Sequence, residues 1–400
     1  MTTDVPDATG ATGAHERSAI DDELSAGIRA LLNDDIATGR FSAAACEVAI
    51  GGRQRVELYL GTLSSFGPDG APLPAAEQAP VGRDTLFDLA SVTKIFTAHT
   101  ALTLVDAGLA ELDAPIADAL PSYRAPGRDR VTLRHLLTHT SGLPATWDGW
   151  REALSRWLEA HPDSGRLTTT PLTDRDGLIS ALLETPLEAA PGTRFEYACT
   201  GYNTAMACFE ALTGESWREL LARHTLGPLG LAQTTADPEP SVAAATEYQP
   251  QFRRGVVQGV VHDETSWSLG GGTGNAGLFS TARDLLRFGE AIRLGEGRVR
   301  GQWMWDDALT ATLGRPTAEP TGGFGSALGL RIGDADFMGD ASGARGHTGF
   351  TGTSLHIDRD AGVTIALLTN RVHPSREGTG SQQLRRRVAE LVTAAARSAR

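Results

Sequence analysis

Apolar residues follow a helical spacing and then a strand spacing near the start of the chain. Residues 18–39 repeat apolar side chains about every three to four positions, which is typical of a helix packed on one side. Strand-like runs follow over residues 43–50 and 55–61. The pair Gly51-Gly52 between these runs is typical of a tight hairpin turn. The pattern therefore predicts a helix and then a β-hairpin.

The same two patterns return towards the end of the chain. Strand-like runs cover residues 328–332, 353–358 and 363–370. Helical spacing covers residues 281–293 and roughly 380–398. Strands near both ends of a long chain favour a single sheet that joins the two terminal regions. We expect that sheet to be antiparallel and flanked by helices.

The stretch between these ends shows helical patterns broken by many Pro and Gly residues, and strands are hard to find there. We therefore expect an α/β (α+β) sheet domain formed by residues 18–108 and 281–400. A mainly helical domain would be formed by residues 109–280. Residues 63–84 are rich in Gly, Pro and Ala and are expected to form a loop. Residues 1–17 are small and polar, and we expect them to be disordered.

Charge and cysteine content limit the partners of the chain. With a net charge of −13, its surface would repel a phosphate backbone, so we expect no nucleic-acid partner. The basic cluster 385–387 lies in an expected helix and is interpreted as a solvated helix face. The three cysteines are sparse and lack CxxC spacing, which argues against a disulfide scaffold and a zinc site. We expect no metal and no cofactor.

The sequence shows neither an expected membrane helix nor an expected signal peptide. No segment approaches the ~20 apolar residues of a membrane helix. The N-terminus has no basic start followed by an apolar run, so no signal peptide is expected. We therefore expect a cytoplasmic protein without a membrane partner. The sequence leaves the oligomeric state open.

Candidate chemistry stands at the start of an expected helix over residues 91–107. Ser91 and Lys94 are three positions apart, so on a helix they share one face. A serine hydroxyl is a poor nucleophile until a neighbouring base takes its proton. Lys94 could be that base only if its pKa falls from ~10.4 towards neutrality. An N-cap serine followed by a surface lysine has the same spacing, so the pair alone is a weak signal.

Two further motifs give the pair a context. Residues 191–199 are PGTRFEYAC and residues 346–350 are GHTGF. With these, the chain resembles the serine β-lactamase family: class C β-lactamases, penicillin-binding D-alanyl-D-alanine carboxypeptidases, and related esterases and transacylases. That family carries SxxK, Tyr-x-Asn and Lys/His-Thr-Gly in this order. The resemblance covers about residues 20–395 and includes RDTLFDLASVTKIFTA (83–98), GLAELDAPIADALP (108–121), VTLRHLLTHTSGLP (131–144), GPLGLAQT (227–234) and NAGLFSTARDLLRF (275–288).

The resemblance implies a β-lactamase/transpeptidase-like fold and an acyl-enzyme mechanism. It implies that Ser91 forms the acyl-enzyme and that Lys94 is a general base or proton relay. Tyr197 would protonate the leaving group or activate the incoming nucleophile. The backbone N–H groups of Ser91 and Phe350 would form the oxyanion hole. The substrate pocket would be lined by Cys199, His347, Thr348 and Gly349.

Two positions depart from the family pattern. Cys199 stands where the family has Asn and cannot donate an amide N–H, which puts peptide-like substrates in doubt. His347 in place of Lys carries less charge at neutral pH, which should weaken recognition of a carboxylate. A shifted alignment that uses Tyr202-Asn203 instead of Tyr197 stays open.

Two weaker signals are interpreted as structural. His135 and His139 have a zinc-compatible spacing, but no Glu follows as in HExxH. The glycines at positions 272, 274 and 277 match a dinucleotide fingerprint, but no strand precedes them. We expect that segment to be a loop near the site, where glycines allow backbone to approach closely.

The expected function is hydrolysis of small carboxylic esters through an acyl-Ser91 intermediate. An amine or alcohol acceptor would instead make the protein a biosynthetic transacylase. Strained amide or peptide donors would make it a β-lactamase or a D-amino-acid carboxypeptidase, and we expect poor β-lactam turnover. The intact Ser91, Lys94 and Tyr197 argue against a non-catalytic sensor domain. Four tryptophans are favoured as core and could otherwise line an acceptor site: Trp147, Trp150, Trp157 and Trp217.

Overall fold

A seven-stranded antiparallel sheet forms the centre of the computed structural model, which describes residues 9–295, 324–378 and 380–398, with backbone alone for 9–18. Its strand order is β2-β1-β11-β10-β9-β8-β7. The first and last strands of the chain are therefore neighbours, as the sequence predicted. The strands of this sheet are β1 (Ala43–Ile50), β2 (Arg53–Gly61), β7 (Gly325–Ser326), β8 (Arg331–Ile332), β9 (Arg345–Thr348), β10 (Ser354–Asp358) and β11 (Val363–Thr369).

The N-terminal hairpin follows from its two glycines. Gly51 and Gly52 have φ angles of 62° and 75°. Positive φ at both central residues is the conformation of a type I′ turn, whose twist matches that of the flanking strands. The predicted hairpin between β1 and β2 is confirmed.

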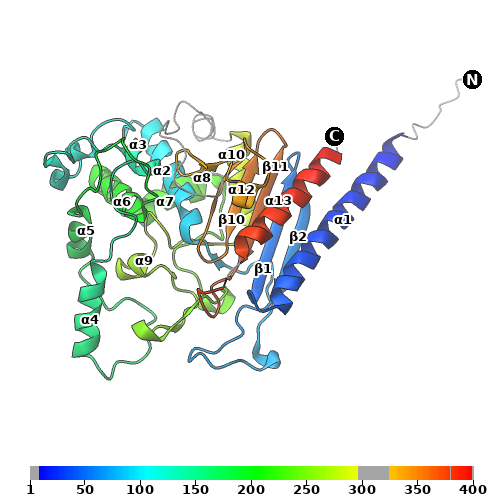
Figure 1. The fold of residues 1–400 in the computed structure, drawn as a ribbon, viewed down its shortest axis with the longest axis horizontal. Helices are drawn as coiled ribbons and strands as arrows, with labels where there is room; N and C mark the ends of the chain where they lie inside the picture. The colour runs from blue at the N-terminus through cyan, green and yellow to red at the C-terminus, as the bar shows by residue number, and fades with distance from the viewer. Residues whose placement is uncertain (1–8, 296–323, 379, 399–400) are drawn as a thin grey trace, which may run out of the picture.

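Helices cover both faces of the sheet (Figure 1). α1 (Thr9–Ala37) and α13 (Ser381–Ser398) lie side by side on one face and enclose a hydrophobic core with the strands. α10 (Ala282–Leu294) packs on the opposite face. It begins at Thr281, whose side chain accepts a hydrogen bond from the Asp284 backbone N–H. This N-cap explains why the predicted helix starts there.

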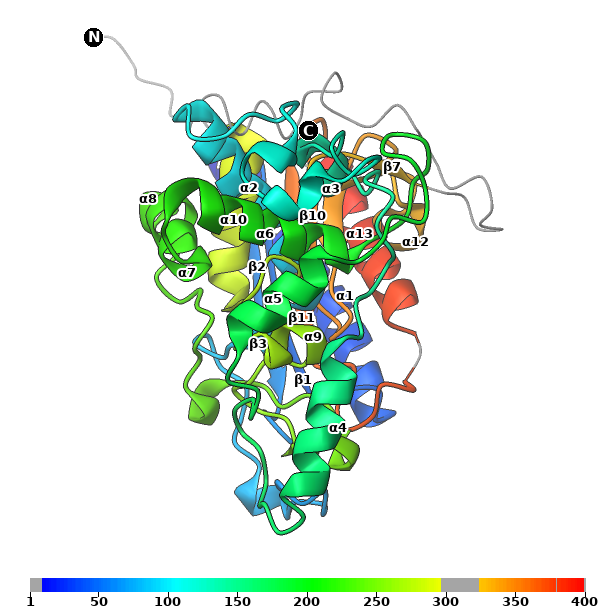
Figure 2. The same ribbon diagram turned by 90° about the vertical axis from the view of Figure 1, so that its left-hand side faces the viewer.

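The middle of the chain is mainly helical and lies against the α10 face of the sheet (Figure 2). Outside the main sheet, the described residues form two further antiparallel pairs of two-residue strands: β3 (Phe87–Asp88) with β6 (Phe279–Ser280), and β4 (Tyr248–Gln249) with β5 (Gly255–Val256). The remaining helices are α2 (Thr93–Asp106), α3 (Leu133–Leu137), α4 (Trp150–Ala160), α5 (Arg175–Leu183), α6 (Cys199–Thr213), α7 (Trp217–Leu221), α8 (Gly227–Leu229), α9 (Glu264–Ser268) and α12 (Ala335–Met338). The exact domain boundaries at residues 108 and 280 stay a prediction.

Two local predictions were wrong. α1 begins at Thr9, so residues 9–17 are helical where disorder was expected, and residues 1–8 lie outside the described residues. The strand expected over 328–332 is instead the turn and second strand of the hairpin β7–β8. Gly329, with a φ of 77°, reverses the chain inside that apolar run.

The tryptophans belong mainly to the core, which was the favoured interpretation. Trp147, Trp150 and Trp217 are buried in the main hydrophobic cluster. Trp157 is half-buried and stacks on His161. Three of the four side chains are therefore committed to packing.

Within the described residues, no helix combines the length and the apolar character that a membrane crossing requires.

Candidate active site

Ser91 and Lys94 meet at the start of α2, as their spacing predicted. Ser91 lies in a short 3₁₀ turn, Ala90–Val92, that leads directly into the helix. The Lys94 ammonium nitrogen Nζ is 3.0 Å from Ser91 Oγ. Lys94 is completely buried, whereas Ser91 reaches a pocket. The surface-lysine alternative is therefore wrong.

Lys94 has an acceptor for each of its three ammonium protons. Nζ donates to Ser91 Oγ, to the Asn275 backbone carbonyl at 3.1 Å, and to Cys199 Sγ at 3.5 Å. Burial on its own lowers the pKa of Lys94, but the nearby ionisable groups of Cys199 and Tyr197 outweigh it, and the net pKa is raised. This direction is the opposite of the fall that the role of a resting general base would require. Lys94 Nζ donates to the serine oxygen and orients it.

Tyr197 comes to the same point from an extended segment just before α6. Its ring centroid is 5.1 Å from Lys94 Nζ and 4.5 Å from the ring of His139. The ring of Tyr202 is also near, with its centroid 5.5 Å from Lys94 Nζ, but its hydroxyl donates to the Leu137 carbonyl, and only Tyr197 of the two is among the described residues that line the pocket. Asn203 is buried. The geometry therefore favours Tyr197 over the shifted alignment.

Cys199 is the first residue of α6 and is half-buried. Its Sγ is 3.5 Å from Lys94 Nζ, which also donates to the Asn275 carbonyl of the glycine-rich loop. The loop lies close to α2, as shown by the hydrogen bond that the Gly274 carbonyl accepts from Thr97 Oγ1 at 2.7 Å. A Cβ on Gly274 would clash with the Tyr202 carbonyl. The predicted role of these glycines as a close-packed loop at the site is confirmed.

The end of β9 and the residues that follow it form another wall of the pocket that Ser91 reaches. His347 is buried, and its Nδ1–H donates to the Thr348 carbonyl at 2.8 Å. Burial, followed by the charges of Arg331 and Lys94, holds the pKa of His347 well below its ordinary value. His347 is thus neutral and is not itself among the pocket-lining residues, whereas Thr348, Gly349 and Phe350 are.

Two backbone amides, those of the pocket-lining residues Ser91 and Phe350, are available to a ligand. Among the described residues, neither the Ser91 N–H nor the Phe350 N–H has an acceptor within the protein. Both residues line the same pocket of about 290 Å³. Paired unbonded donors beside a nucleophile are the arrangement that stabilises an oxyanion.

The pocket is strongly cationic, which sequence reasoning missed. Arg331, Arg371 and Arg385 line it, and no carboxylate is among its described lining residues. Arg385 is buried and donates to the Gly349 and Thr353 carbonyls, so the interpretation of 385–387 as a solvated helix face is wrong for Arg385, whereas the other two arginines are exposed as expected. Burial and the neighbouring arginines lower the pKa of Arg385 to about 9. The three arginines are distant in sequence, and no linear motif joins them.

The histidines of the HLLTH segment have separate structural tasks. The His135 ring accepts the Thr132 backbone N–H in a capping box. His139 Nδ1 accepts the Ala198 N–H at 3.0 Å, and burial keeps its pKa well below the ordinary value. This neutral ring packs against Tyr197 and thereby supports it. Within the described residues, no group of three His, Cys, Asp or Glu could hold a metal ion.

Comparison with known proteins agrees with this geometry. A protein-family model described as Beta-lactamase matches residues 28–390. The chain belongs to the beta-lactamase family. Its members are serine hydrolases and acyltransferases, and this chain is therefore an enzyme of that kind.

Relatives within the beta-lactamase family differ in activity. The chain is 30% identical to an N-acetylmuramyl-L-alanine amidase of Bacillus subtilis, covering 86% of this chain and 80% of the relative. It is 29% identical to a putative D-alanyl-D-alanine carboxypeptidase of Escherichia coli, covering 72% and 70%. The structure of EstCE1, a hydrolase with promiscuous acyltransferase activity, matches with a TM-score of 0.70 at 20% identity, covering 93% and 99%. That last likeness shows the fold alone.

Proposed function

We propose that this enzyme hydrolyses small carboxylic esters that carry a second, anionic group, through an ester intermediate on Ser91. The observation that supports this most is the contact of Ser91 Oγ with Lys94 beneath two unbonded amides in one pocket. Nucleophile, proton-transfer groups and oxyanion donors thus meet at one point. No cofactor enters the proposed reaction.

In the acylation step, Ser91 Oγ forms a bond to the acyl carbon while the carbon–oxygen bond to the leaving alcohol breaks. The serine proton passes to Lys94 as Lys94 gives a proton to Tyr197 and Tyr197 gives its own to the leaving oxygen, so neither group gains or loses charge. Because Lys94 Nζ donates to Ser91 Oγ and its pKa is not lowered, we assign it the relay rather than the resting base. The developing negative charge on the acyl oxygen is bound by the amides of Ser91 and Phe350.

In the deacylation step, water attacks the acyl carbon and the bond to Ser91 Oγ breaks. Tyr197 takes the proton of the attacking water, and the proton returns to the serine oxygen by the reverse relay. The free acid then leaves, and the site regains its starting protonation state. Atoms and charges balance without an external oxidant or base.

The charge of the pocket supports an anionic substrate. Three arginines line it in a protein whose net charge is −13, so the pocket is a local reversal of the overall sign. Arginine presents a planar fork of donors that matches a carboxylate. The charge that neutral His347 lacks is therefore available from Arg371 and Arg385, and in part from Arg331, whose guanidinium is also paired with Asp334 at 2.9 Å.

The test is intact-protein mass spectrometry after mixing with paired esters that differ only in a free carboxylate or its methyl ester. The carboxylate form should add its acyl mass to Ser91 faster and then release free acid. Ser91→Ala should show no adduct, while Ser122→Ala, which changes an exposed serine outside the site, should behave like wild type. Failure of wild-type protein to acylate with any ester of the panel would overturn the proposal.

A second candidate is hydrolysis of an amide in a peptide-like molecule. The amidase relative at 30% identity and the arginine-lined pocket favour it, because peptides end in a carboxylate. Cys199 in place of an amide side chain disfavours it, because Sγ donates its hydrogen bond only weakly. Matched ester and amide substrates with the same acyl group separate the two. Faster turnover of the amide would establish the second candidate.

Transfer to an amine or alcohol remains the other outcome of the same intermediate. The acyl-Ser91 ester is chemically identical in both reactions, and its fate depends on which nucleophile is positioned in deacylation. The burial of Trp147, Trp150 and Trp217 removes the aromatic surface that could have formed an acceptor site. We therefore propose water as the main acceptor.

A further inference from the structure

His262 connects the two segments that carry the unbonded amides. Its backbone N–H donates to Asp88 Oδ2 at 2.6 Å, three residues before Ser91. Its imidazole ring lies 5.7 Å from the ring of Phe350, with 30° between the planes. A single residue therefore contacts both sides of the expected oxyanion hole.

On the nucleophile side, Asp88 holds a strained turn. Ala90 has a φ of 45°, a left-handed conformation that is uncommon for a residue with a side chain. The other carboxylate oxygen, Asp88 Oδ1, accepts the Ala90 N–H at 2.8 Å and so stabilises this turn. The Thr351 hydroxyl donates to the Asp88 carbonyl at 2.6 Å, which ties the turn to the residue after Phe350. The direction of the Ser91 amide thus depends on Asp88.

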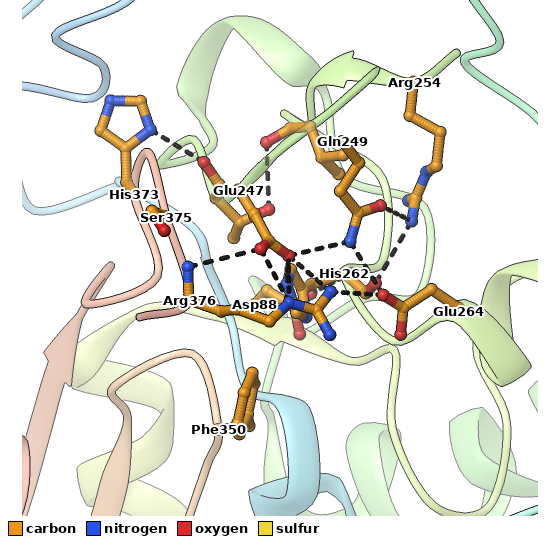
Figure 3. Close-up of polar contacts among 12 residues, drawn as sticks. Asp88, Glu247, Gln249, Arg254, His262, Glu264, Phe350, His373, Ser375 and Arg376 are labelled. Carbon is orange, nitrogen blue, oxygen red and sulfur yellow. Dashed lines mark hydrogen bonds and ion pairs between the residues drawn. The ribbon is translucent and has the colours of Figure 1, made fainter. Parts of the chain in front are cut away.

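On the opposite side, a buried ion network fixes the His262 ring (Figure 3). His262 Nε2 is 2.9 Å from Glu247 Oε2, and Arg376 Nε donates to Glu247 Oε1 at 2.7 Å. Burial alone raises the pKa of Glu247, but hydrogen bonds from His262, Arg376 and Gln249 outweigh it and hold the pKa well below its ordinary value. An ionised carboxylate only accepts, so His262 Nε2 carries the proton. Arg376 also pairs with Glu264, which completes the network.

Phe350 needs this support because it is 49% exposed. Its ring is covered by cations and by His262: the Arg371 guanidinium lies 4.5 Å from the ring centroid and that of Arg376 5.9 Å. The Phe350 carbonyl also accepts a hydrogen bond from Arg371 Nε at 2.8 Å. Removing the stacked surface would free the ring and, with it, the peptide plane that carries the amide.

We propose that His262 is a positioning residue that sets the spacing between the Ser91 and Phe350 amides, and so the strength of the oxyanion hole. The inference rests on the proposed acyl-enzyme chemistry at Ser91 but on no particular substrate. Interactions made only in the transition state change kcat and leave KM almost unchanged. A displacement of such donors costs on the order of 10- to 100-fold in rate.

The experiment measures Ser91 labelling by a fluorophosphonate, in which Oγ bonds to phosphorus, fluoride leaves and the phosphoryl oxygen occupies the oxyanion hole. His262→Ala and His262→Gln should label about 10- to 100-fold more slowly; the second variant keeps a donor for Glu247 and guards against loss of folding. With a turned-over ester, kcat should fall by a similar factor at constant KM. Tyr248→Ala, an exposed aromatic residue next to Glu247, is the matched control and should label at the wild-type rate.

A double-mutant cycle with Phe350→Ala separates positioning from general stability. If His262 acts through the ring of Phe350, His262→Ala should cost less than threefold in the Phe350→Ala background. Full additivity, or unchanged labelling in both folded His262 variants, overturns the inference. Labelled protein that hydrolyses no ester overturns the proposed function and leaves this inference standing. Wild-type protein that is not labelled at Ser91 overturns both.

Discussion

Acid should weaken the sheet that carries the substrate wall, and His356 should account for a defined part of that loss. This residue lies on β10, where it pairs in register with Gly346 of β9. It is 2% exposed, and neither ring nitrogen has a hydrogen-bond partner among the described residues. Burial lowers the pKa of His356 to about 4, although the charge of Asp358 partly opposes this.

The magnitude follows from the difference between the two states. A histidine in the unfolded chain has a pKa near 6.5, so below that pH the unfolded state binds a proton that the folded state refuses. The stability that comes from keeping His356 neutral is therefore fully present above about pH 6.5, and it is lost progressively as the pH falls towards 4. At about 1.4 kcal/mol for each pH unit, this loss amounts to roughly 3 kcal/mol of the free energy of unfolding.

The assay is urea unfolding of wild type and His356→Leu at several values between pH 7 and pH 4. Leucine fills a similar volume and cannot bind a proton, so its advantage over wild type should grow by roughly 3 kcal/mol across this range. Ile357→Leu on the same strand is the control and should shift stability equally at each pH, because it changes no titratable group. A constant difference between His356→Leu and wild type would refute the buried neutral imidazole.

Three further outcomes are expected at the site. Lys94→Met should keep the fold and lower Ser91 acylation by at least about 100-fold, measured by stopped-flow mixing with an activated ester, because the relay and the orienting donor are both lost; acylation within tenfold of wild type would remove Lys94 from the mechanism. Cys199→Asn should improve kcat/KM for amide-bearing substrates more than for simple esters, since it supplies an amide donor beside Lys94; equal changes in both classes would argue against a pocket role. Arg331→Met should raise KM for a carboxylate ester about fivefold and leave its methyl ester unchanged, because an exposed or half-buried charge pair contributes about 1 kcal/mol; equal KM changes for the two esters would indicate that Arg331 acts only structurally.

Local patterns predicted most of the fold. The hairpin at Gly51-Gly52 and the strands β10 and β11 have clear periodicity and short-range turn signals, so sequence reasoning found them. The prediction of a strand over 328–332 was wrong, because a glycine inside an apolar stretch allows a turn as readily as a strand. The helix from Thr9 was missed because its start has a polar, small-residue composition that also fits disorder.

The site was predictable only where the residues form linear motifs. Ser91 and Lys94 are three positions apart, and their contact follows from helix geometry. The surroundings of Lys94 were not predictable, because its contacts with Cys199 and the Asn275 carbonyl involve residues that are far away in sequence. The arginine lining and the His262 network were missed for the same reason: each brings together residues that are far apart in sequence.

The pairing of β1 with β11 has a consequence for the order of events during synthesis. Ile50 pairs with Val363, so the N-terminal hairpin leaves the ribosome on the order of 300 residues before its neighbour, roughly 15–60 s at usual elongation rates. Throughout that interval the inner edge of β1 has no partner strand, and such an edge is open to pairing with other chains. The nascent protein therefore depends on protection of this edge, by α1 or by a chaperone, until its last strands emerge.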